Sequence, residues 1–213
     1  WKKCLYGLAG LVSLAMLWPP ADAPGQCAPD AVRLRLAWLN TQGVTDPAPL
    51  AAWLEAEQPD AVAFAELRPG AAAVRRAMRV LYPYAQFCHR SGNCGTVIHT
   101  RGPPINVAAL ARGDPQNRRA LSAVRTGLRL GDGTPFNLMA THLSRPLPLG
   151  RQREELAELE GHIEQPADTI ILGDFNATRR TATLRDFASR NGLVVAAADG
   201  PTWPVQWEGH SAL

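Results

Sequence analysis

The sequence predicts an α/β domain in which mixed β-sheets are covered by helices. Apolar runs short enough for strands, such as 170–172, alternate with longer amphipathic segments, such as 150–163. Two strand-like runs, 121–130 and 136–143, are joined by Gly131-Asp132-Gly133 and predict an antiparallel hairpin. Because a hairpin occurs beside alternating strands and helices, mixed sheets are favoured over a purely parallel, doubly wound sheet. A chain of 213 residues, 46% of them hydrophobic, can bury one sizeable core.

The first half of the chain predicts two strands, each followed by a helix. Residues 32–38 alternate apolar and basic side chains, as a strand with one solvent-exposed face does, and this strand ends at Asn40. The segment 45–58 begins with Thr-Asp-Pro, which supplies an N-cap and a first-turn proline for a helix. Residues 60–66 form a short apolar run that ends in a carboxylate and predict a buried strand. Residues 71–81 predict the second helix.

The second half of the chain continues this alternation. Residues 96–99 predict a strand that precedes the hairpin. The helix predicted over 150–163 carries leucines and an isoleucine at inward-facing positions. The short apolar strand 170–172 stops at a glycine. The last predicted helix, 183–190, is ended by Asn191-Gly192, a pair typical of helix C-termini.

The N-terminal residues 1–20 predict a hydrophobic membrane anchor or signal segment, followed by a linker over 21–30. Lys2 and Lys3 precede an uncharged run, and no Lys or Arg follows until Arg33. This asymmetry orients the start of the segment toward the cytoplasm and exports the rest. The run is roughly 22 Å long as a helix, which is short for a bilayer core of about 30 Å.

A cleavage site of the small-x-small type follows at Ala21-Asp22-Ala23. Cleavage would leave Pro24 at the new N-terminus, so we expect an uncleaved anchor. A buried N-terminal helix is the alternative. The expected location is the cell membrane, with the domain formed by 31–213 on the periplasmic, extracytoplasmic side.

Cysteine usage is compatible with an oxidising compartment. Cys88 and Cys94 bracket a short polar loop, and a bridge between them would stabilise the fold by roughly 2–2.5 kcal/mol. A metal site is less favoured here, because only His89 and His99 lie nearby and no second cysteine pair exists. Cys27 would be left over, free or intermolecular.

Polar residues follow the apolar runs at the points where four predicted strands end. They are Asn40, Glu66, His142, Asp174 and Asn176. Taken singly, each has an ordinary structural interpretation as a turn residue, a solvated carboxylate or a hydrogen-bonded histidine. If adjacent strands bring their ends to one edge, two carboxylates, two amides and an imidazole converge there. We interpret the set as a candidate site.

These residue types suit phosphoester hydrolysis assisted by a divalent cation. A hard cation such as Mg²⁺, or Mn²⁺, takes few protein oxygens and binds substrate phosphate; Glu66 and Asn40 are the predicted ligands. His142 and Asn176 can donate hydrogen bonds to the phosphate, and Asp174 can orient or deprotonate the attacking water. The net charge of +3 does not by itself indicate a nucleic-acid binder.

Four segments in this order, "LAWLNTQG", "PDAVAFAELRPG", "NLMATHL" and "TIILGDFNAT", resemble motifs of the endonuclease/exonuclease/phosphatase superfamily. The resemblance covers about Val32 to Pro204, and "GDFN" is its most specific motif. It implies a four-layer α/β sandwich of two packed mixed β-sheets flanked by helices. It also implies that Asn40 and Glu66 are metal ligands, with His142, Asp174 and Asn176 catalytic. The run after the histidine, beginning "THLSRP", resembles membrane-anchored bacterial members with an exported catalytic domain.

The chain departs from the family pattern at its C-terminus. By resemblance, two further strands should carry an Asp-His or Asp-Tyr pair and a Ser-Asp-His, whereas this sequence ends "PTWPVQWEGHSAL". His210 is not preceded by aspartate, so we do not assign it to that histidine. We expect a C-terminally incomplete domain, with its last strands missing and weak or no activity for the chain as written.

The favoured function is a metal-dependent phosphodiesterase or nuclease. The alternatives are a phospholipid head-group phosphodiesterase or phosphomonoesterase, and a non-catalytic family member that binds ligands at the same edge. The expected partners are a phosphoester substrate, either nucleic acid or a phospholipid head group, and the membrane through the N-terminal segment. We expect a monomer.

Overall fold

A computed structural model describes residues 32–42, 44, 46–67, 71–90, 94–111, 121–145 and 150–196, and the backbone of 206–207 and 210–211. Contacts divide the chain into Trp1–Ala31 and Val32–Leu213, and every described residue belongs to the second unit. The predicted anchor (1–20) and linker (21–30) therefore lie outside the described residues. None of the described helices has the length and apolar character needed to cross a membrane.

The first β-sheet has four strands in the order β1-β2-β4-β3. Their bounds are β1 Leu36–Asn40, β2 Ala61–Ala65, β3 Tyr84–Phe87 and β4 Val97–Thr100. β1 and β2 run parallel, whereas β4 is antiparallel to both β2 and β3. The sheet is therefore mixed, as predicted.

The second β-sheet also has four strands, in the order β5-β6-β7-β8. Their bounds are β5 Asn106–Ala109, β6 Ser122–Arg129, β7 Pro135–His142 and β8 Thr169–Asp174. β6 and β7 form the predicted hairpin, and β7 pairs in parallel with β8. A separate two-stranded sheet joins β9 (Gln206–Trp207) and β10 (His210–Ser211), so His210 lies in a strand whose side chains are outside the description.

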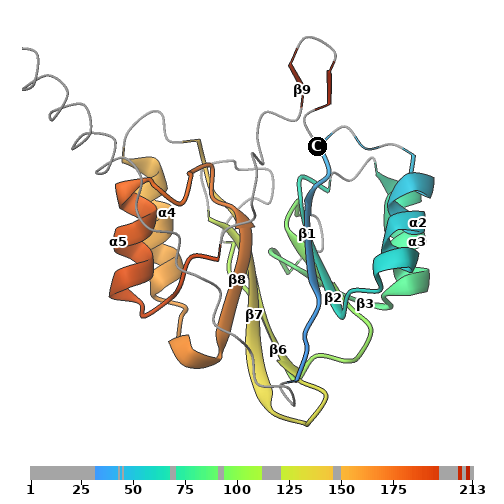
Figure 1. The fold of residues 1–213 in the computed structure, drawn as a ribbon, viewed down its shortest axis with the longest axis horizontal. Coiled ribbons are helices and arrows are strands. Elements are labelled where there is room, and N and C mark those ends of the chain that lie inside the picture. The colour runs from blue at the N-terminus through green and yellow to red at the C-terminus, as the bar shows by residue number, and fades with distance from the viewer. Residues whose placement is uncertain are drawn as a thin grey trace, which may run out of the picture. The chain divides into compact units, whose positions relative to one another are not determined.

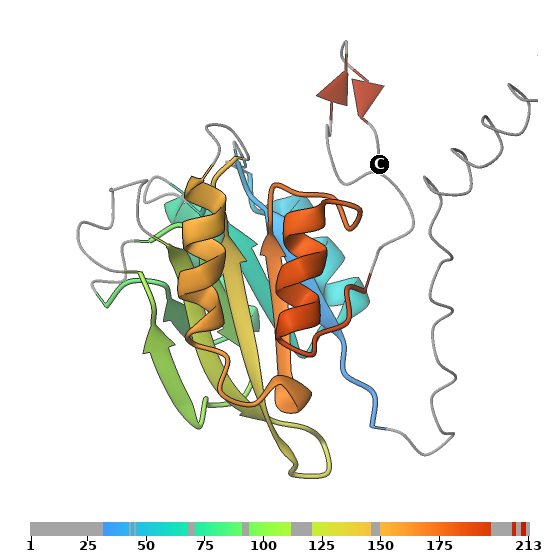
Figure 2. The same ribbon diagram turned by 90° about the vertical axis from the view of Figure 1, so that its left-hand side faces the viewer.

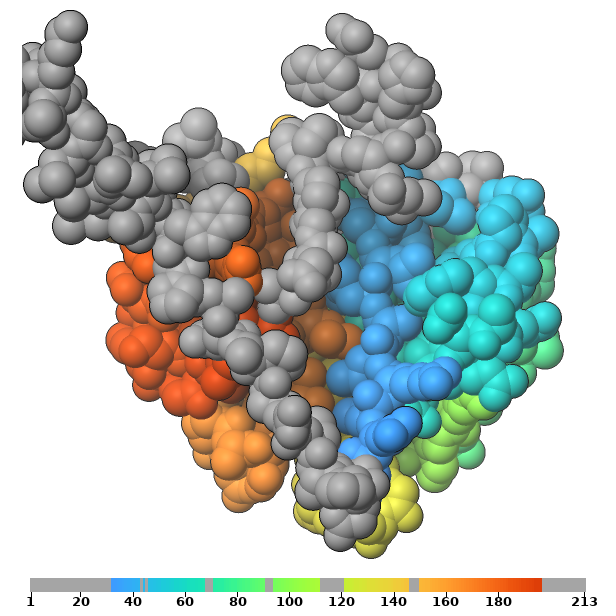
Figure 3. All heavy atoms as spheres, in the orientation of Figure 1, coloured from blue at the N-terminus to red at the C-terminus, as the bar shows by residue number. Residues whose placement is uncertain are grey.

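Two helices cover the outer face of each large sheet (Figures 1 and 2). α2 (Ala48–Glu57) and α3 (Ala72–Leu81) pack on the first sheet, and α4 (Arg151–Glu160) and α5 (Ala182–Arg190) pack on the second. A 3₁₀ turn, η1 (Pro166–Asp168), leads into β8. In the space-filling view, α2 and α5 lie on opposite flanks (Figure 3). The predicted four-layer sandwich is confirmed.

The alternation of side chains along β2 explains how the layers fit together. Ala61 and Ala63 point into the core between the two sheets, whereas Val62 and Phe64 point into the core under α2 and α3. All four are essentially inaccessible to solvent. Because alanine occupies little volume, β2 packs closely against β7 and β8 of the opposite sheet. This close packing brings the ends of strands from both sheets together.

Three details differ from the sequence-based expectations. The first strand begins at Leu36 rather than at residue 32, because Arg35 exchanges hydrogen bonds with Asp60 instead of joining the ladder. The edge strands β3 and β5 were not predicted. Each pairs on one side only, with β4 and β6 respectively.

The disulfide considered from the sequence is present between Cys88 and Cys94. Both cysteines are buried in the core between the sheets, close to the Ser122 hydroxyl at the start of β6. Ser122 lies opposite His142 in the β6–β7 pair. The bridge thus lies beneath the edge of the sandwich where the candidate residues gather. Cys27 lies outside the described residues.

Candidate active site

The carboxyl ends of four strands form one edge of the sandwich, here called the rim. β1 and β2 are parallel and end level with each other, at Asn40 and Ala65. β7 and β8 are parallel and end level at His142 and Asp174. Since β2 packs against β7 and β8 across the core, both pairs deliver their polar end residues to the same place. The convergence expected from the sequence is what the structure contains.

Glu66 follows β2 in a backbone conformation that is unusual for its type. Its φ is +57°, in the left-handed region that costs a non-glycine residue about 1–2 kcal/mol. The neighbouring chain holds it there: Leu67 N–H donates to the Gly95 carbonyl at 3.0 Å. A Cβ on Gly95 would lie 3.4 Å from the Glu66 Cα, so a glycine permits this close approach. In this conformation the Glu66 carboxylate lies at the rim, where Oε1 accepts a hydrogen bond from Asn40 Nδ2.

Asn40 connects the two carboxylates of the site. Its amide Nδ2 donates to Glu66 Oε1 at 3.3 Å and to Asp174 Oδ2 at 3.2 Å. Its Oδ1 accepts from Gln42 N–H at 3.0 Å, which fixes the side chain. Residues 134 positions apart in the sequence are thereby joined across the two sheets. Asn40 thus makes the hydrogen bond of a turn residue and also contacts both carboxylates of the rim.

His142 faces the same two carboxylates from the end of β7. Its Nε2 lies 3.9 Å from Glu66 Oε1 and 4.0 Å from Asp174 Oδ2. These distances are too long for hydrogen bonds, and they place the imidazole beside both carboxylates. About a quarter of the side chain is exposed (26%), so the ring is accessible to a substrate. Both sheets therefore contribute charged groups to one small volume.

Asp174 and Asn176 form a tight turn after β8. Asn176 N–H donates to Asp174 Oδ1 at 3.0 Å, and Asn176 Nδ2 donates to the Leu143 carbonyl at 2.7 Å. Asn176 has a φ of +47°, which asparagine tolerates better than most residues. One N–H of its amide is thus engaged within the protein. The other N–H is available to a ligand.

Gly173 separates the apolar residues of β8 from Asp174, and its lack of a side chain has a structural reason. It lies opposite Thr141 in the parallel β7–β8 pair. A Cβ at this position would lie 2.6 Å from the Thr141 carbonyl oxygen and 2.7 Å from its Cγ2, closer than real contacts allow. The glycine therefore lets the two strands approach fully. Their next residues, His142 and Asp174, are brought together as a result.

The described side chains fit a magnesium-type cation better than a zinc-type one. No group of three or more His, Cys, Asp and Glu side chains within the described part of the chain is arranged to hold a metal ion. Mg²⁺ and Mn²⁺ do not need such a cage, because one or two carboxylates, water and substrate oxygens complete their coordination. Glu66 and the Asn40 amide supply a donor set of this kind, with the Asp174 carboxylate beside it. Turning the amide by 180° would direct Oδ1, in place of Nδ2, toward a bound cation, and would break the hydrogen bond from Gln42 N–H to Oδ1.

Sequence reasoning missed a second layer of polar residues beneath the rim. Gln152 and Glu155 of α4 are 5% exposed and hydrogen-bond the chain just after β7 and β8. A signal was present in the sequence. These two positions share a helix face with Leu156 and Leu159, where a solely structural helix would carry apolar residues.

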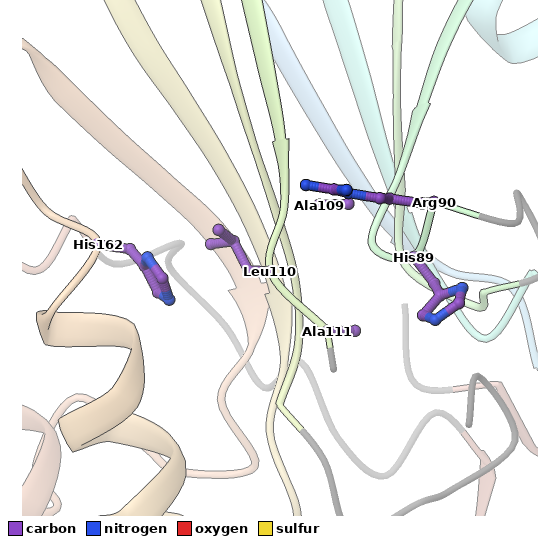
Figure 4. Close-up of a pocket in the computed structure, with 6 residues that line it drawn as sticks. All are labelled: His89, Arg90, Ala109, Leu110, Ala111 and His162. Carbon is purple, nitrogen blue, oxygen red and sulfur yellow. The ribbon is translucent and has the colours of Figure 1, made fainter. Parts of the chain in front are cut away.

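A separate cavity of about 380 Å³ opens beside the end of β5 (Figure 4). The residues that line it are His89, Arg90, Ala109, Leu110, Ala111 and His162. None of these lining residues is a carboxylate, and none is among the five predicted site residues. The candidate site is therefore the open rim and not this cavity.

Comparisons with known proteins agree with the fold and with the family resemblance. Residues 37–212 match the model of the Endonuclease/Exonuclease/phosphatase family. No curated protein sequence matches significantly. TDP2 from D. rerio, complexed with a single-strand DNA product, superimposes with a TM-score of 0.55 at 21% identity, over 76% of this chain and 66% of that chain.

Beta toxin from Staphylococcus aureus is also similar in structure, and two of its forms illustrate this. The structure with bound magnesium ions gives a TM-score of 0.58 at 17% identity, over 74% of this chain and 66% of that chain. A β-hairpin deletion mutant gives 0.59 at 18% identity, over 83% and 79%. For TDP2, the 66% of that chain that is covered is slightly under two thirds of its length.

Structural likeness at these identities establishes the fold alone. The family model covers far more than half of the chain, and all five candidate residues of the rim fall within the matched range. The chain therefore belongs to the endonuclease/exonuclease/phosphatase family, whose members are hydrolases that act on phosphoester bonds.

Proposed function

We propose that this protein is a divalent-metal-dependent phosphodiesterase, with nucleic acid as its first substrate class. One observation carries the proposal. The amide of Asn40 bridges Glu66 and Asp174, and His142 Nε2 lies within 4.0 Å of both carboxylates. Two acids, an amide and an imidazole at one accessible rim can bind a cation and a phosphate together.

Asn40 and Glu66 are the proposed metal ligands. Held there, Mg²⁺ or Mn²⁺ supplies Lewis-acid polarisation and charge neutralisation at the phosphate. The strained backbone of Glu66 supports this role, since left-handed non-glycine residues persist where the surroundings hold a functional group in place. The cation side of the site thus belongs to the first sheet.

The residues of the second sheet act on the phosphate and the water. His142 donates from Nε2 to a phosphate oxygen, and Asn176 donates its remaining amide N–H to the same group. Asp174 orients the attacking water and accepts its proton. The hydrogen bond from Asn176 N–H to Asp174 Oδ1 fixes this carboxylate and leaves Oδ2 directed at the rim.

Two considerations bear on the substrate. TDP2, similar in fold, was solved with a single-strand DNA product, which supports testing nucleic acid first. The expected membrane segment instead favours a phospholipid head group as the alternative substrate, cleaved as a phosphodiester or a phosphomonoester.

We further propose attachment to the cell membrane through residues 1–20, with the catalytic domain on the extracytoplasmic side. The Cys88–Cys94 bridge supports an oxidising location.

The test is turnover by the chain, expressed with any coding sequence that flanks it. It is incubated with Mg²⁺ and, in parallel, with plasmid DNA, RNA and phospholipid vesicles, and EDTA serves as the metal-free control. We expect metal-dependent release of product from nucleic acid. Release from vesicles alone would select the phospholipid alternative. Binding of these ligands without turnover of any of them would contradict an enzymatic function and leave the ligand-binding alternative.

A further inference from the structure

Helix α4 places two polar side chains where its buried face should be apolar. Gln152 and Glu155 are each only 5% exposed and lie on the face that carries Leu156 and Leu159. Burying an amide and a carboxylate costs free energy unless hydrogen bonds compensate. Within the described part of the chain, the hydrogen bonds of these two side chains go to the segments that follow β7 and β8.

Gln152 joins these two segments through a single amide group. Its Nε2 donates to the Ser144 carbonyl at 3.0 Å and to the Phe175 carbonyl at 2.7 Å, and lies 3.5 Å from the Asn176 carbonyl. Ser144 is two residues beyond His142, and Phe175 directly follows Asp174. A single side chain thus ties the backbone after the histidine to the backbone after the aspartate.

Glu155 fixes the first of the two segments from the same helix. Its Oε2 accepts from Ser144 N–H at 2.7 Å and its Oε1 accepts from the Ser144 hydroxyl at 2.6 Å. Arg151, one turn earlier, places Nε 3.5 Å from Oε1 and partly balances the buried charge. Charge-assisted hydrogen bonds of this kind are short and strong. Ser144 is therefore held at both its backbone groups and its side chain.

We propose that Gln152, supported by Glu155, is a positioning residue for the reaction at the rim. It holds the segments after β7 and β8 at a fixed separation and keeps Asn176 in its left-handed conformation, so that His142, Asp174 and Asn176 meet the phosphate together. This inference rests on the proposed function. We call Gln152 and Glu155, with the two segments that they join, the clamp. Because Asn40 and Glu66 belong to the other sheet, the clamp acts on the phosphate side of the site and not on the cation ligands.

The first test compares Gln152→Leu with Gln165→Leu, the same substitution at an exposed position. Gln152→Leu should lower kcat at least about tenfold, because sub-ångström misplacement of reacting groups is enough for such losses. The Mn²⁺ affinity should stay within about twofold of wild type, and Gln165→Leu should match wild type in both measurements. A loss of Mn²⁺ affinity as large as the loss of kcat would indicate general damage and overturn the positioning role.

The second test is the pH profile of Gln152→Glu. At neutral pH an ionised carboxylate would face three carbonyl oxygens, so kcat should fall. Protonation at lower pH restores one donor, so kcat relative to wild type should rise as the pH falls. A ratio to wild type that does not change with pH would contradict a role for the donated hydrogen bonds.

A third measurement does not depend on turnover. Amide hydrogen exchange in segments 143–145 and 174–177 should accelerate at least about tenfold in Gln152→Leu and stay unchanged in Gln165→Leu. Unchanged exchange in Gln152→Leu would overturn the clamp, whatever the activity. Faster exchange with unchanged kcat in an active protein would overturn its catalytic importance. Absence of turnover in wild type would refute the proposed function and the positioning role that rests on it. The hydrogen-exchange measurement would then test only whether Gln152 holds the two segments together.

Discussion

Gly173→Ala tests the geometry on which the rim depends. The added methyl carbon would lie 2.6 Å from the backbone oxygen of Thr141, its partner across the β7–β8 pair. A backbone oxygen within a paired ladder cannot rotate away as a flexible side chain can. The two strands must therefore separate, and the separation passes directly to His142 and Asp174, the next residues on each strand.

The expected cost follows from the overpacked contact. Inserting a methyl group into a well-packed site costs about 1–3 kcal/mol, and the rigid partner places this variant at about 2–3 kcal/mol. For a domain of this size, that corresponds to a fall in Tm of about 5–10 °C. Gly102→Ala is the matched control, because Gly102 is exposed and an added Cβ meets nothing within 4 Å. The control should leave stability unchanged or raise it by up to about 1 kcal/mol.

The assay is chemical denaturation of both variants, followed by kcat on the best substrate. Gly173→Ala should lose stability and also lose kcat at least about tenfold. Adding Thr141→Ser removes the Cγ2 contact at 2.7 Å and leaves the carbonyl contact, so stability should recover only in part. If Gly173→Ala were as stable and active as Gly102→Ala, the close approach of β7 and β8 would be wrong.

Three further predictions concern the catalytic groups, a buried histidine and the disulfide. His142→Ala and Asp174→Asn should each lower kcat at least about a hundredfold at saturating metal, and wild-type rates in both would refute their assignment. Burial lowers the pKa of His99 from 6.5 to about 4, so only the unfolded chain binds its proton between these values. The free energy of unfolding should therefore fall by about 3 kcal/mol as the pH drops from 7 to 4. His99→Asn should remove this contribution of His99 to the pH dependence of the free energy of unfolding, measured by denaturation at several pH values. An unchanged pH dependence in His99→Asn would contradict the prediction. Replacing Cys88 and Cys94 together by alanine should cost about 2 kcal/mol or more in denaturation under non-reducing conditions, and equal stability would mean that the bridge contributes nothing.

The sequence predicted the site residues because they follow apolar strands directly. A strand that ends level with its parallel neighbour must present its end residue at the same edge, so the positions of Asn40, Glu66, His142 and Asp174 follow from strand order. Asn176 was predicted for the same reason, two residues beyond Asp174. The strand order itself was not predicted, since no local pattern states which strands pair; the family resemblance implied only two packed mixed sheets.

The edge strands β3 and β5 could not be read from the sequence. Tyr84–Phe87 and Asn106–Ala109 are four residues each, and their side chains are mostly exposed or half-buried, so neither forms the buried run that marks β4. Their extended backbone is defined by pairing with β4 and β6, which is a property of the fold rather than of the segment. The predicted start of the first strand, at residue 32, was wrong for a related reason. A side chain from another segment, Asp60, binds Arg35 and ends the ladder.

The supporting layer was missed because helix patterns are usually read through their apolar positions. Gln152 and Glu155 look like ordinary polar helix residues until their partners in the segments after β7 and β8 are known. The left-handed conformations of Glu66 and Asn176 were equally hidden. Asparagine carries a weak statistical signal for this conformation and glutamate carries none.

Cation binding tests the central claim most directly, since the account places one divalent ion on Asn40 and Glu66, beside the phosphate-binding residues of the second sheet. Mn²⁺ is titrated into wild type, Glu66→Gln and the exposed control Glu55→Gln, and free Mn²⁺ is followed by electron paramagnetic resonance. We expect one site in wild type, equal affinity in Glu55→Gln and affinity at least about tenfold weaker in Glu66→Gln. Wild-type affinity in Glu66→Gln would contradict the account.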